Sequence, residues 1–214
     1  MARYWIADLH LGHDKVAKIR GFEDASYHDE IITSQLTNLK SGDEVWVLGD
    51  ISSGKPEDED YALGTLQNIS VFEGIRFHLI AGNHDSVSSI HRNGFKKQAV
   101  WLDVFDSIQQ FAVMKLNGAR VLMSHYPYSR SGDGPGRGSA RYKEFRLPDT
   151  GMPLIHGHTH HTEKHMDLYG DWEQQVLEPG ESKVADTQQF CVSWDAHRQL
   201  VTEHDLNQWI EGIK

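Results

Sequence analysis

Cysteine is almost absent from this sequence, with one residue, Cys191, among 214. A single thiol cannot form an internal disulfide, and the alternating, strand-like run around Cys191 indicates a small buried side chain. Also absent is any stretch near the roughly 18 consecutive apolar residues that a membrane-spanning helix needs. Residues 1–3 lead directly into a strand-like run, so we expect no signal peptide. These absences predict a cytoplasmic protein with no membrane partner.

Positive charge is also scarce, because 21 Lys and Arg residues face 31 Asp and Glu residues and give a net charge of -10. A general nucleic-acid binder is expected to be basic, so this balance disfavours a nucleic-acid partner. The argument is incomplete, since bound cations would neutralise several carboxylates. Histidine, by contrast, is abundant at 14 residues, and six of them lie in or beside the motifs described below. That enrichment indicates metal binding.

The chain is long enough, and with 38% hydrophobic residues apolar enough, to bury a substantial core. Because we find no internal repeat and no linker, we expect one domain over residues 1–214. The first part alternates expected strands at 3–7, 44–48 and 75–80 with expected helices at 14–20, 26–40 and 57–69 and a short helix ending near His91. From residue 98 we expect strands in succession, at 98–105, 108–115, 119–124, 153–156, 188–194 and 199–203, and a last helix at 204–213. The succession, with a hairpin turn at Asn117-Gly118, predicts a second, largely antiparallel sheet.

Five short apolar runs are each followed by Asp, Asn or His. The motifs are Asp8-Leu9-His10, Gly49-Asp50, Gly82-Asn83-His84-Asp85, His125 and Gly157-His158-Thr159-His160. In open α/β sheets, ligands bind beyond the carboxyl ends of the strands. Residues two apart in extended backbone point the same way, so Asp8 with His10, and His158 with His160, are each expected to face one site.

Carboxylate, imidazole and amide ligands without thiolate suit Mn, Fe, Zn, Co or Ni rather than a structural zinc site. Seven such side chains are too many for one cation, and Asp50, alone after its glycine, is the natural bridge between two. Two metals roughly 3.5–4 Å apart would activate water for in-line displacement at phosphorus. Each motif alone is usually a turn, and a lone histidine such as His125 is usually structural. Five motifs together favour the metal site.

The ordered set of motifs resembles the calcineurin-like metallophosphoesterase superfamily. The stretches Asp8–His13, His125-Tyr126-Pro127 and Val192-Ser193-Trp194-Asp195 resemble its small bacterial and phage members in particular. The resemblance implies a four-layer α/β/β/α sandwich with two mixed β-sheets. It also implies a binuclear centre, for which Mn or an Fe/Mn pair is favoured. Its ligands would be Asp8, His10 and His160 for the first metal, Asp50 as the bridge, and Asn83, His125 and His158 for the second.

The resemblance further implies that His84, next to Asn83, faces the phosphoryl group and stabilises its charge or protonates the leaving oxygen. Asp85 is expected to orient His84. Family members that act on phosphoproteins carry an Arg-containing extension after the Gly-Asp pair. Here no arginine follows Asp50 until Arg76, which argues against a protein phosphatase.

Residues 129–147 form an insertion rich in Gly and Arg, with five basic and two acidic residues. It is either a flexible solvated loop or a substrate clamp, and we favour the clamp because it connects His125 with His156. Arg137 or Arg141 would then bind a substrate phosphate. His13 is either part of a helix start or a substrate contact. We expect His161 and His165 to be solvated, and His28 and His78 to be structural.

We therefore expect an enzyme that hydrolyses a small phosphate ester by attack of metal-activated hydroxide. A phosphodiester such as a 2′,3′-cyclic or other cyclic nucleotide is the preferred substrate, with phosphomonoesters as a further class. One alternative is a DNA or RNA nuclease, and another is a non-catalytic metal-binding interaction module. The sequence leaves the oligomeric state open.

Overall fold

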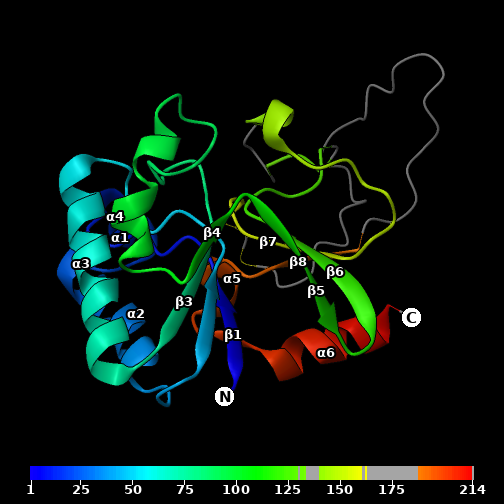
Figure 1. Ribbon diagram of the computed structural model, residues 1–214, viewed down its shortest axis with the longest axis horizontal. Coiled ribbons are helices and arrows are strands. Elements are labelled where there is room, and N and C mark those ends of the chain that lie inside the picture. The colour runs from blue at the N-terminus through cyan, green and yellow to red at the C-terminus, as the bar shows by residue number, and fades with distance from the viewer. Residues whose placement is uncertain (130, 134–139, 161, 163–187, 214) are drawn as a thin grey trace.

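The computed structural model describes residues 1–129, 131–133, 140–160, 162 and 188–213 (Figure 1). Its first sheet has the strand order β4-β3-β2-β1-β9. The strands are β1 (Arg3–Ile6), β2 (Glu44–Val47), β3 (Arg76–Ile80), β4 (Ser107–Gln109) and β9 (Val201–Thr202). The first four run parallel, and β9 is antiparallel to β1. The carboxyl ends of β1, β2 and β3 therefore meet at one edge.

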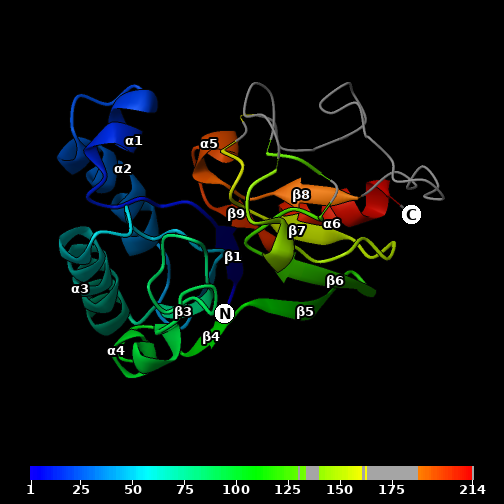
Figure 2. The same cartoon turned by 90° about the horizontal axis from the view of Figure 1, so that it is seen from above.

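Helices cover one face of this sheet (Figures 1 and 2). They are α1 (Asp14–Ile19), α2 (Ala25–Thr37), α3 (Pro56–Glu73) and α4 (Gln98–Leu102). Apolar side chains of alternate strand positions, such as Val45, Phe77 and Leu79, pack with Leu36 of α2 and Leu66 of α3 in one buried cluster. This burial, rather than helix propensity, fixes the helices against the sheet.

The second sheet has the order β5-β6-β7-β8. Its strands are β5 (Phe111–Leu116), β6 (Ala119–Ser124), β7 (Leu154–His156) and β8 (Gln189–Cys191). Asn117 and Gly118 form the predicted hairpin turn, both with positive φ. The prediction of a largely antiparallel sheet is wrong, because only β5 and β6 are antiparallel while β6, β7 and β8 run parallel. The chain returns between these strands by long connections, which permit parallel pairing.

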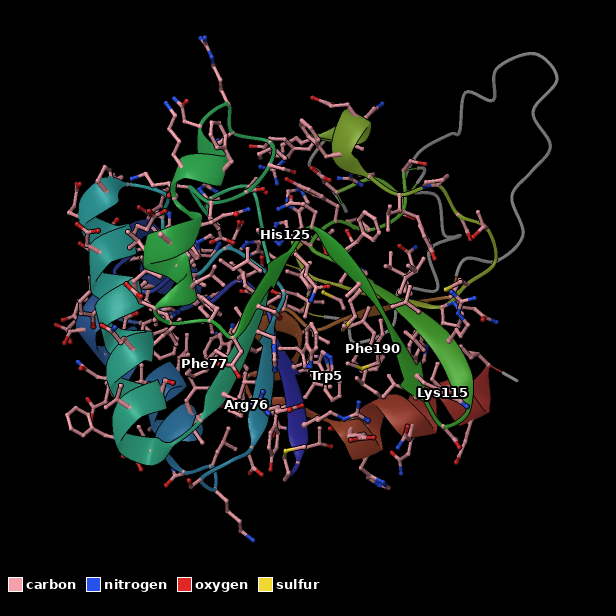
Figure 3. The ribbon with its side chains drawn as sticks, in the orientation of Figure 1. Trp5, Arg76, Phe77, Lys115, His125 and Phe190 are labelled. Carbon is pink, nitrogen blue, oxygen red and sulfur yellow. The ribbon has the colours of Figure 1, made fainter. Side chains whose placement is uncertain are left out.

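A second core lies between the sheets, as Trp5 and Phe190 show in Figure 3. Helix α6 (Glu203–Gly212) completes it with Leu206, Trp209 and Ile210 and packs against strands of both sheets. The α6 helix begins with a reciprocal capping box between Thr202 and Asp205. The structure has the predicted α/β character with two mixed sheets, and helices cover the outer face of the first sheet.

Several predicted elements differ from those observed. Residues 98–105, expected as a strand, form α4 and the turn after it, and no helix ends near His91, where turns lead into the 3-10 helix η1 (Gly94–Lys96). Residues 108–115 are divided at Gln110, so that β4 joins the first sheet and β5 the second. The expected strand 188–194 ends at Cys191, and Trp194 begins the short helix α5 (Trp194–His197). The remaining described element is the 3-10 helix η2 (Lys143–Phe145) in the insertion.

The ends of the two sheets are tied together where the motifs lie. Ala7, after β1, forms an isolated parallel bridge with Ser193, which follows β8. The Ala7 amide donates to the Val192 carbonyl at 2.9 Å, and the Trp194 amide donates to the Ala7 carbonyl at 3.0 Å. The loops after β1, β2, β3, β6 and β7 consequently converge on one region. No helix in the described part of the chain is both long and apolar enough to span a membrane.

Candidate metal centre

Asp8, His10 and His160 form the first group of possible metal ligands. Their ligand atoms lie within 4.8 Å of one another. His10 Nε2 and His160 Nε2 are 3.1 Å apart, and His160 Nε2 is 3.9 Å from Asp8 Oδ1. Asp8 and His10 are buried, so these groups are already largely removed from water. The sequence prediction that these three residues meet is confirmed, although 150 positions separate His10 from His160.

Asp50, His125 and His158 form the second group, again with ligand atoms within 4.8 Å. His125 Nε2 lies 3.5 Å from Asp50 Oδ2 and 3.2 Å from the side-chain oxygen of Asn83. All four of these side chains are buried. All seven side chains expected as ligands therefore lie in two neighbouring groups, and their role as ligands stays a prediction.

The backbone of these motifs is left-handed rather than extended. Among the described non-glycine residues, eight have positive φ, and five of those are expected ligands: Asp8, His10, Asp50, His158 and His160. The assumption of extended backbone was therefore wrong, although each pair does face the site. A non-glycine residue in this region costs on the order of 1 kcal/mol. Such strain, repeated at five expected ligands, indicates that the surrounding fold holds these residues for a purpose other than stability.

Three glycines make room for the ligands. A Cβ on Gly49 would lie 2.5 Å from His125 Nδ1, one on Gly82 would lie 2.3 Å from Asp50 Oδ1, and one on Gly157 would lie 3.1 Å from Asp8 Oδ2. Distances below 3.0 Å are steric overlaps, so Gly49 and Gly82 exclude a side chain. Gly157 does so too, because a Cβ there would lie 2.5 Å from Ala7 Cβ. The glycines in the motifs are therefore spacers that let backbone approach the ligand side chains.

Three of the imidazoles are held by the nitrogen that faces away from the site. His10 Nδ1 donates to the Ser52 carbonyl at 2.9 Å, His125 Nδ1 to the Leu48 carbonyl at 2.7 Å, and His160 Nδ1 to Asp195 at 2.8 Å. A neutral ring that donates from Nδ1 has a lone pair on Nε2, which is the form that binds metals. Each ring thus presents Nε2 to its group.

Two features of these groups fit bound metal ions. The Nε2 atoms of His10 and His160 face each other at 3.1 Å, so two lone pairs would meet unless a proton or a cation lies there. His158 Nε2 is buried and has no hydrogen-bond partner among the described residues, because the nearby Asp133 Oδ1 lies 3.6 Å away, beyond hydrogen-bond distance. Unpaired buried nitrogens are costly, and a divalent cation at each group would satisfy both features.

Burial controls the protonation of these groups. It lowers the pKa of the His158 imidazole to about 3 and also holds the pKa of His10 well below its usual value, so both rings are neutral at neutral pH. Burial would raise the pKa of the Asp50 carboxyl, but the facing His125 and His10 outweigh it and lower that pKa. Because His125 and His10 belong to different groups, Asp50 acts electrostatically on both, as a bridging carboxylate would.

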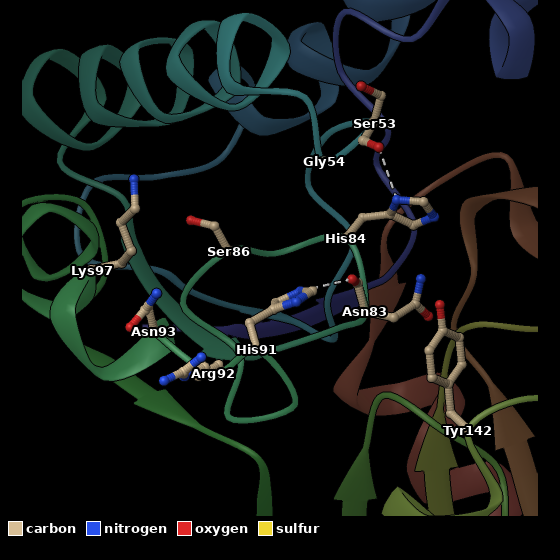
Figure 4. A pocket seen from close by; sticks show the side chains of 10 residues that line it. All are labelled: Ser53, Gly54, Asn83, His84, Ser86, His91, Arg92, Asn93, Lys97 and Tyr142. Carbon is tan, nitrogen blue, oxygen red and sulfur yellow. Dashed lines mark hydrogen bonds between the residues drawn. The ribbon is translucent and has the colours of Figure 1, made fainter.

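His84 lies beside the two groups without joining either. Its amide donates to Asp50 Oδ1 at 2.7 Å, and its Nδ1 donates to the Ser53 carbonyl at 2.8 Å (Figure 4). The ring therefore directs Nε2 to the cavity. His84 and His13 both line a cavity of about 300 Å³ together with Asp50, Asn83, His158 and His160. The predicted positions of His84 and His13 at the site are consistent with this lining, and their roles stay predictions.

The predicted role of Asp85 is wrong. Its carboxylate accepts hydrogen bonds from the amides of Asp50, Ile51 and Gly82 at 2.7–3.0 Å, while the His84 ring is held by Ser53 instead. Burial and the neighbouring Asp50 raise the pKa of Asp85 to about 6. Asp85 therefore fixes the loop that carries Asp50, rather than the ring of His84.

Sequence reasoning missed a buried network behind His160. Asp195 accepts from His160 Nδ1 and from Arg20 Nη2 at 2.6 Å, and Arg20 also donates to the Asp8 carbonyl at 2.7 Å. Burial would raise the pKa of Asp195, but these hydrogen bonds outweigh it and hold that pKa well below its usual range. The network thus holds two residues of the first group, Asp8 and His160, at once. Arg20 directly follows the short helix α1, and no sequence signal distinguishes it.

Asp133, in the insertion, was also missed. It is buried, is paired with Arg146, and accepts from Arg141 Nε at 2.7 Å. Asp133 Oδ1 lies 3.6 Å from His158 Nε2. Arg141 lines the metal cavity, but its guanidinium is engaged with Asp133 rather than directed freely at a substrate. The described part of the insertion is therefore packed against the site; Arg137, His161 and His165 lie outside the described residues.

Comparison with known proteins gives a consistent picture. A model of the calcineurin-like phosphoesterase superfamily domain matches residues 1–195. The Gene 66 protein of Mycobacterium phage D29 is 34% identical over 220 residues, which cover 100% of this chain and 98% of that protein. The Gene 66 protein of Mycobacterium phage L5 is 33% identical over 170 residues, covering 75% and 78% of the two chains.

A similar fold is present in the crystal structure of AQ665, a protein of unknown function from Aquifex aeolicus. The two structures superpose with a TM-score of 0.62 over 97% of this chain and 98% of that one. Their sequence identity is 20%, so the likeness concerns the fold alone.

Proposed function

This chain belongs to the calcineurin-like phosphoesterase superfamily, and from that premise we propose that it is a binuclear metal-dependent phosphodiesterase. Membership makes the chain a metal-dependent phosphoesterase, that is, a hydrolase. The finer proposal is supported by one observation: the seven expected ligands lie in two adjoining groups. In these groups the Nε2 atoms of His10 and His160 face each other, and that of His158 has no hydrogen bond.

We place one cation among Asp8, His10 and His160 and one among Asn83, His125 and His158, with Asp50 bridging them. The nitrogen and oxygen ligands without thiolate support Mn or an Fe/Mn pair. Two such cations would activate a water molecule and stabilise charge on the attacking and leaving oxygens of a phosphate ester. A small phosphate ester as partner and a cytoplasmic location remain predictions from the sequence.

The chain's own groups would then position the ester. The hydrogen bond from His84 Nδ1 to the Ser53 carbonyl fixes the ring with Nε2 toward the cavity, where it can donate a proton to the leaving oxygen when the ring is charged. The loop after β3 carries both His84 and Asn83, so the donor is held beside a ligand. A cavity of about 300 Å³ suits a small phosphodiester, including a cyclic nucleotide.

Exchange of Asp50 for alanine tests this proposal. We expect Asp50→Ala to lower metal content, measured by plasma mass spectrometry, and to reduce hydrolysis of bis(4-nitrophenyl) phosphate by at least roughly 100-fold. Asp106→Asn is the matched control, because Asp106 is an exposed carboxylate paired with Arg76 at the opposite edge of the sheet. Two bound metals and full turnover in Asp50→Ala would overturn the binuclear assignment.

A further inference from the structure

A second cavity adjoins the metal centre. It has a volume of about 530 Å³ and shares Asn83 and His84 with the smaller metal cavity (Figure 4). The phosphodiester proposed above accounts for the smaller cavity only. The larger one has the volume of a nucleotide-sized ligand, and no part of the metal chemistry uses it.

The lining of this second cavity is cationic. Arg92 and Lys97 line it, and Lys96 lies between them on η1. All three are exposed, and in the described part of the chain none of them forms an ion pair. The lining includes no carboxylate; the nearby Glu59 is buried and accepts from Ser86, a lining residue. Although the protein has a net charge of -10, this local excess of positive charge would attract an anionic ligand.

Residues 91–97, which carry these cations, are bonded to the loop after β3 that carries Asn83. His91 Nε2 donates to the Asn83 carbonyl at 3.1 Å, so Arg92 follows a residue bonded to an expected metal ligand (Figure 4). Gly94 packs tightly on the preceding turn, where a Cβ would lie 2.3 Å from the Ser88 carbonyl oxygen. These contacts hold the 91–97 segment at a set position relative to the metal centre.

Tyr142 lies on the other side of the cavity, at its junction with the metal site (Figure 4). Its ring centroid is 5.8 Å from that of His158. A half-buried aromatic ring beside a cationic wall is a usual combination for nucleotides, in which a base or sugar contacts the ring and phosphates contact the cations.

We propose that Arg92 and Lys97 form a subsite for a second phosphate, so that the substrate is a phosphodiester of a nucleotide carrying a further phosphate group. The inference rests on the proposed function and narrows its substrate class. Arg92 can bind a phosphate through two parallel N–H donors, while Lys97 supplies a mobile charge. Two kinds of ligand present a phosphodiester together with a second phosphate: a small nucleotide with two phosphates and a short polynucleotide.

A pair of chromogenic esters tests the subsite. One is thymidine 5′-(4-nitrophenyl phosphate) and the other is the same ester with a 3′-phosphate. We expect the 3′-phosphate to raise kcat/KM about tenfold or more with Mn-loaded protein, an advantage that falls with added KCl because exposed charges are screened. The double variant Arg92→Gln with Lys97→Gln should reduce the ratio of the two kcat/KM values to near one.

The matched control is Lys115→Gln with Arg120→Gln. These exposed cations face each other across the β5–β6 hairpin and line neither cavity, so the ratio should persist. A ratio near one in the native protein, or an unchanged ratio in the Arg92/Lys97 variant, overturns the subsite.

A binding measurement separates failure of the subsite from failure of the proposed function. Calorimetry in the His84→Ala background should show thymidine 3′,5′-bisphosphate binding about tenfold more tightly than either monophosphate. If neither ester is hydrolysed, the phosphodiesterase proposal fails, while this affinity ratio still decides the subsite. Affinity that rises from a dinucleotide to a hexanucleotide would assign the subsite to a polynucleotide, and a plateau would assign it to a small nucleotide; equal affinities for mono- and bisphosphate refute both.

Discussion

Imidazole orientation is the residue-scale property on which the metal centre depends. His10 and His125 are held by neutral backbone carbonyls, whereas His160 is held by the buried, charged Asp195. Burial would lower the pKa of His160, but the Asp8 and Asp195 carboxylates outweigh it and raise that pKa. Of the two rings in the first group, His160 is therefore the more basic. It takes up a proton more readily than His10 when no cation is bound.

His84 should separate catalysis from metal binding. Because its ring is bonded to the Ser53 carbonyl and belongs to neither ligand group, we expect His84→Ala to retain both metals. Loss of a proton donor typically costs about 10²–10⁴ in rate. Single-turnover and steady-state assays should show a larger loss for an alkyl phosphodiester than for a nitrophenyl one, since nitrophenolate leaves without protonation.

The control for that experiment is His204→Ala, which removes an exposed imidazole from α6. If His84→Ala loses a metal ion and excess Mn restores its rate, His84 is a ligand rather than a proton donor. Equal losses for both esters would instead limit His84 to charge stabilisation.

The convergence of the expected ligands was predictable at this scale because short motifs mark their positions, and their role as ligands stays a prediction. Asp8, Asp50 and His125 follow apolar runs, and that local signal suffices. The partners of the second nitrogen were not predictable: Ser53 holds His84, and Asp195 holds His160 from 35 positions away. Such contacts depend on how the loops pack, which composition and spacing do not encode.

At the scale of elements, we expect substitutions in the loop after β7 to disturb the site and the stability of the fold. Gly157 approaches β1 so closely that a Cβ would lie 2.5 Å from Ala7 Cβ and 3.1 Å from Asp8 Oδ2. We expect Gly157→Ala to displace Asp8, to lower the metal content of the first group, and to destabilise the protein by about 1–3 kcal/mol. Urea unfolding of the metal-free protein measures the loss of stability.

Gly64, in the interior of α3, is the matched control. A Cβ there meets nothing within 4 Å, so Gly64→Ala should stabilise the protein by about 1 kcal/mol through helix propensity. If Gly157→Ala has the stability and metal content of the native chain, the close approach of β7 to β1 does not constrain the site.

In the first half, α2 followed from its amphipathic stripe. The strands β1, β2 and β3 followed from short apolar runs, because they are buried between the helices and the second sheet. Residues 98–102 were misassigned because the short apolar run Gln98–Leu102 suits either element, and packing of Trp101 against the first sheet decides for a helix. Likewise, Gln110 carries no signal that the chain leaves one sheet for the other. The left-handed ligand positions were unpredictable because they are imposed by tertiary structure.

At the scale of the whole molecule, the net charge does not describe the charge of each cavity. The net charge of -10 disfavours polyanions on average, yet the second cavity is lined by Arg92 and Lys97 without a carboxylate. Charges act over about 8–10 Å at physiological salt, so a local group outweighs a distant excess of the opposite sign. The metals, if bound, would shift the balance at the site further toward anions.

Metal removal should lower the stability of the entire fold. The expected ligands come from loops of both sheets, so a cation binds the native state and not the unfolded chain. At a free Mn concentration 100 times Kd, one site contributes about 2.7 kcal/mol, which corresponds to a rise in Tm of roughly 5–10 °C for a chain of this size. Scanning calorimetry with chelator and with graded Mn measures this, and Asp50→Asn should remove most of the rise. A Tm that does not change with Mn would show that the seven side chains converge without binding the ion.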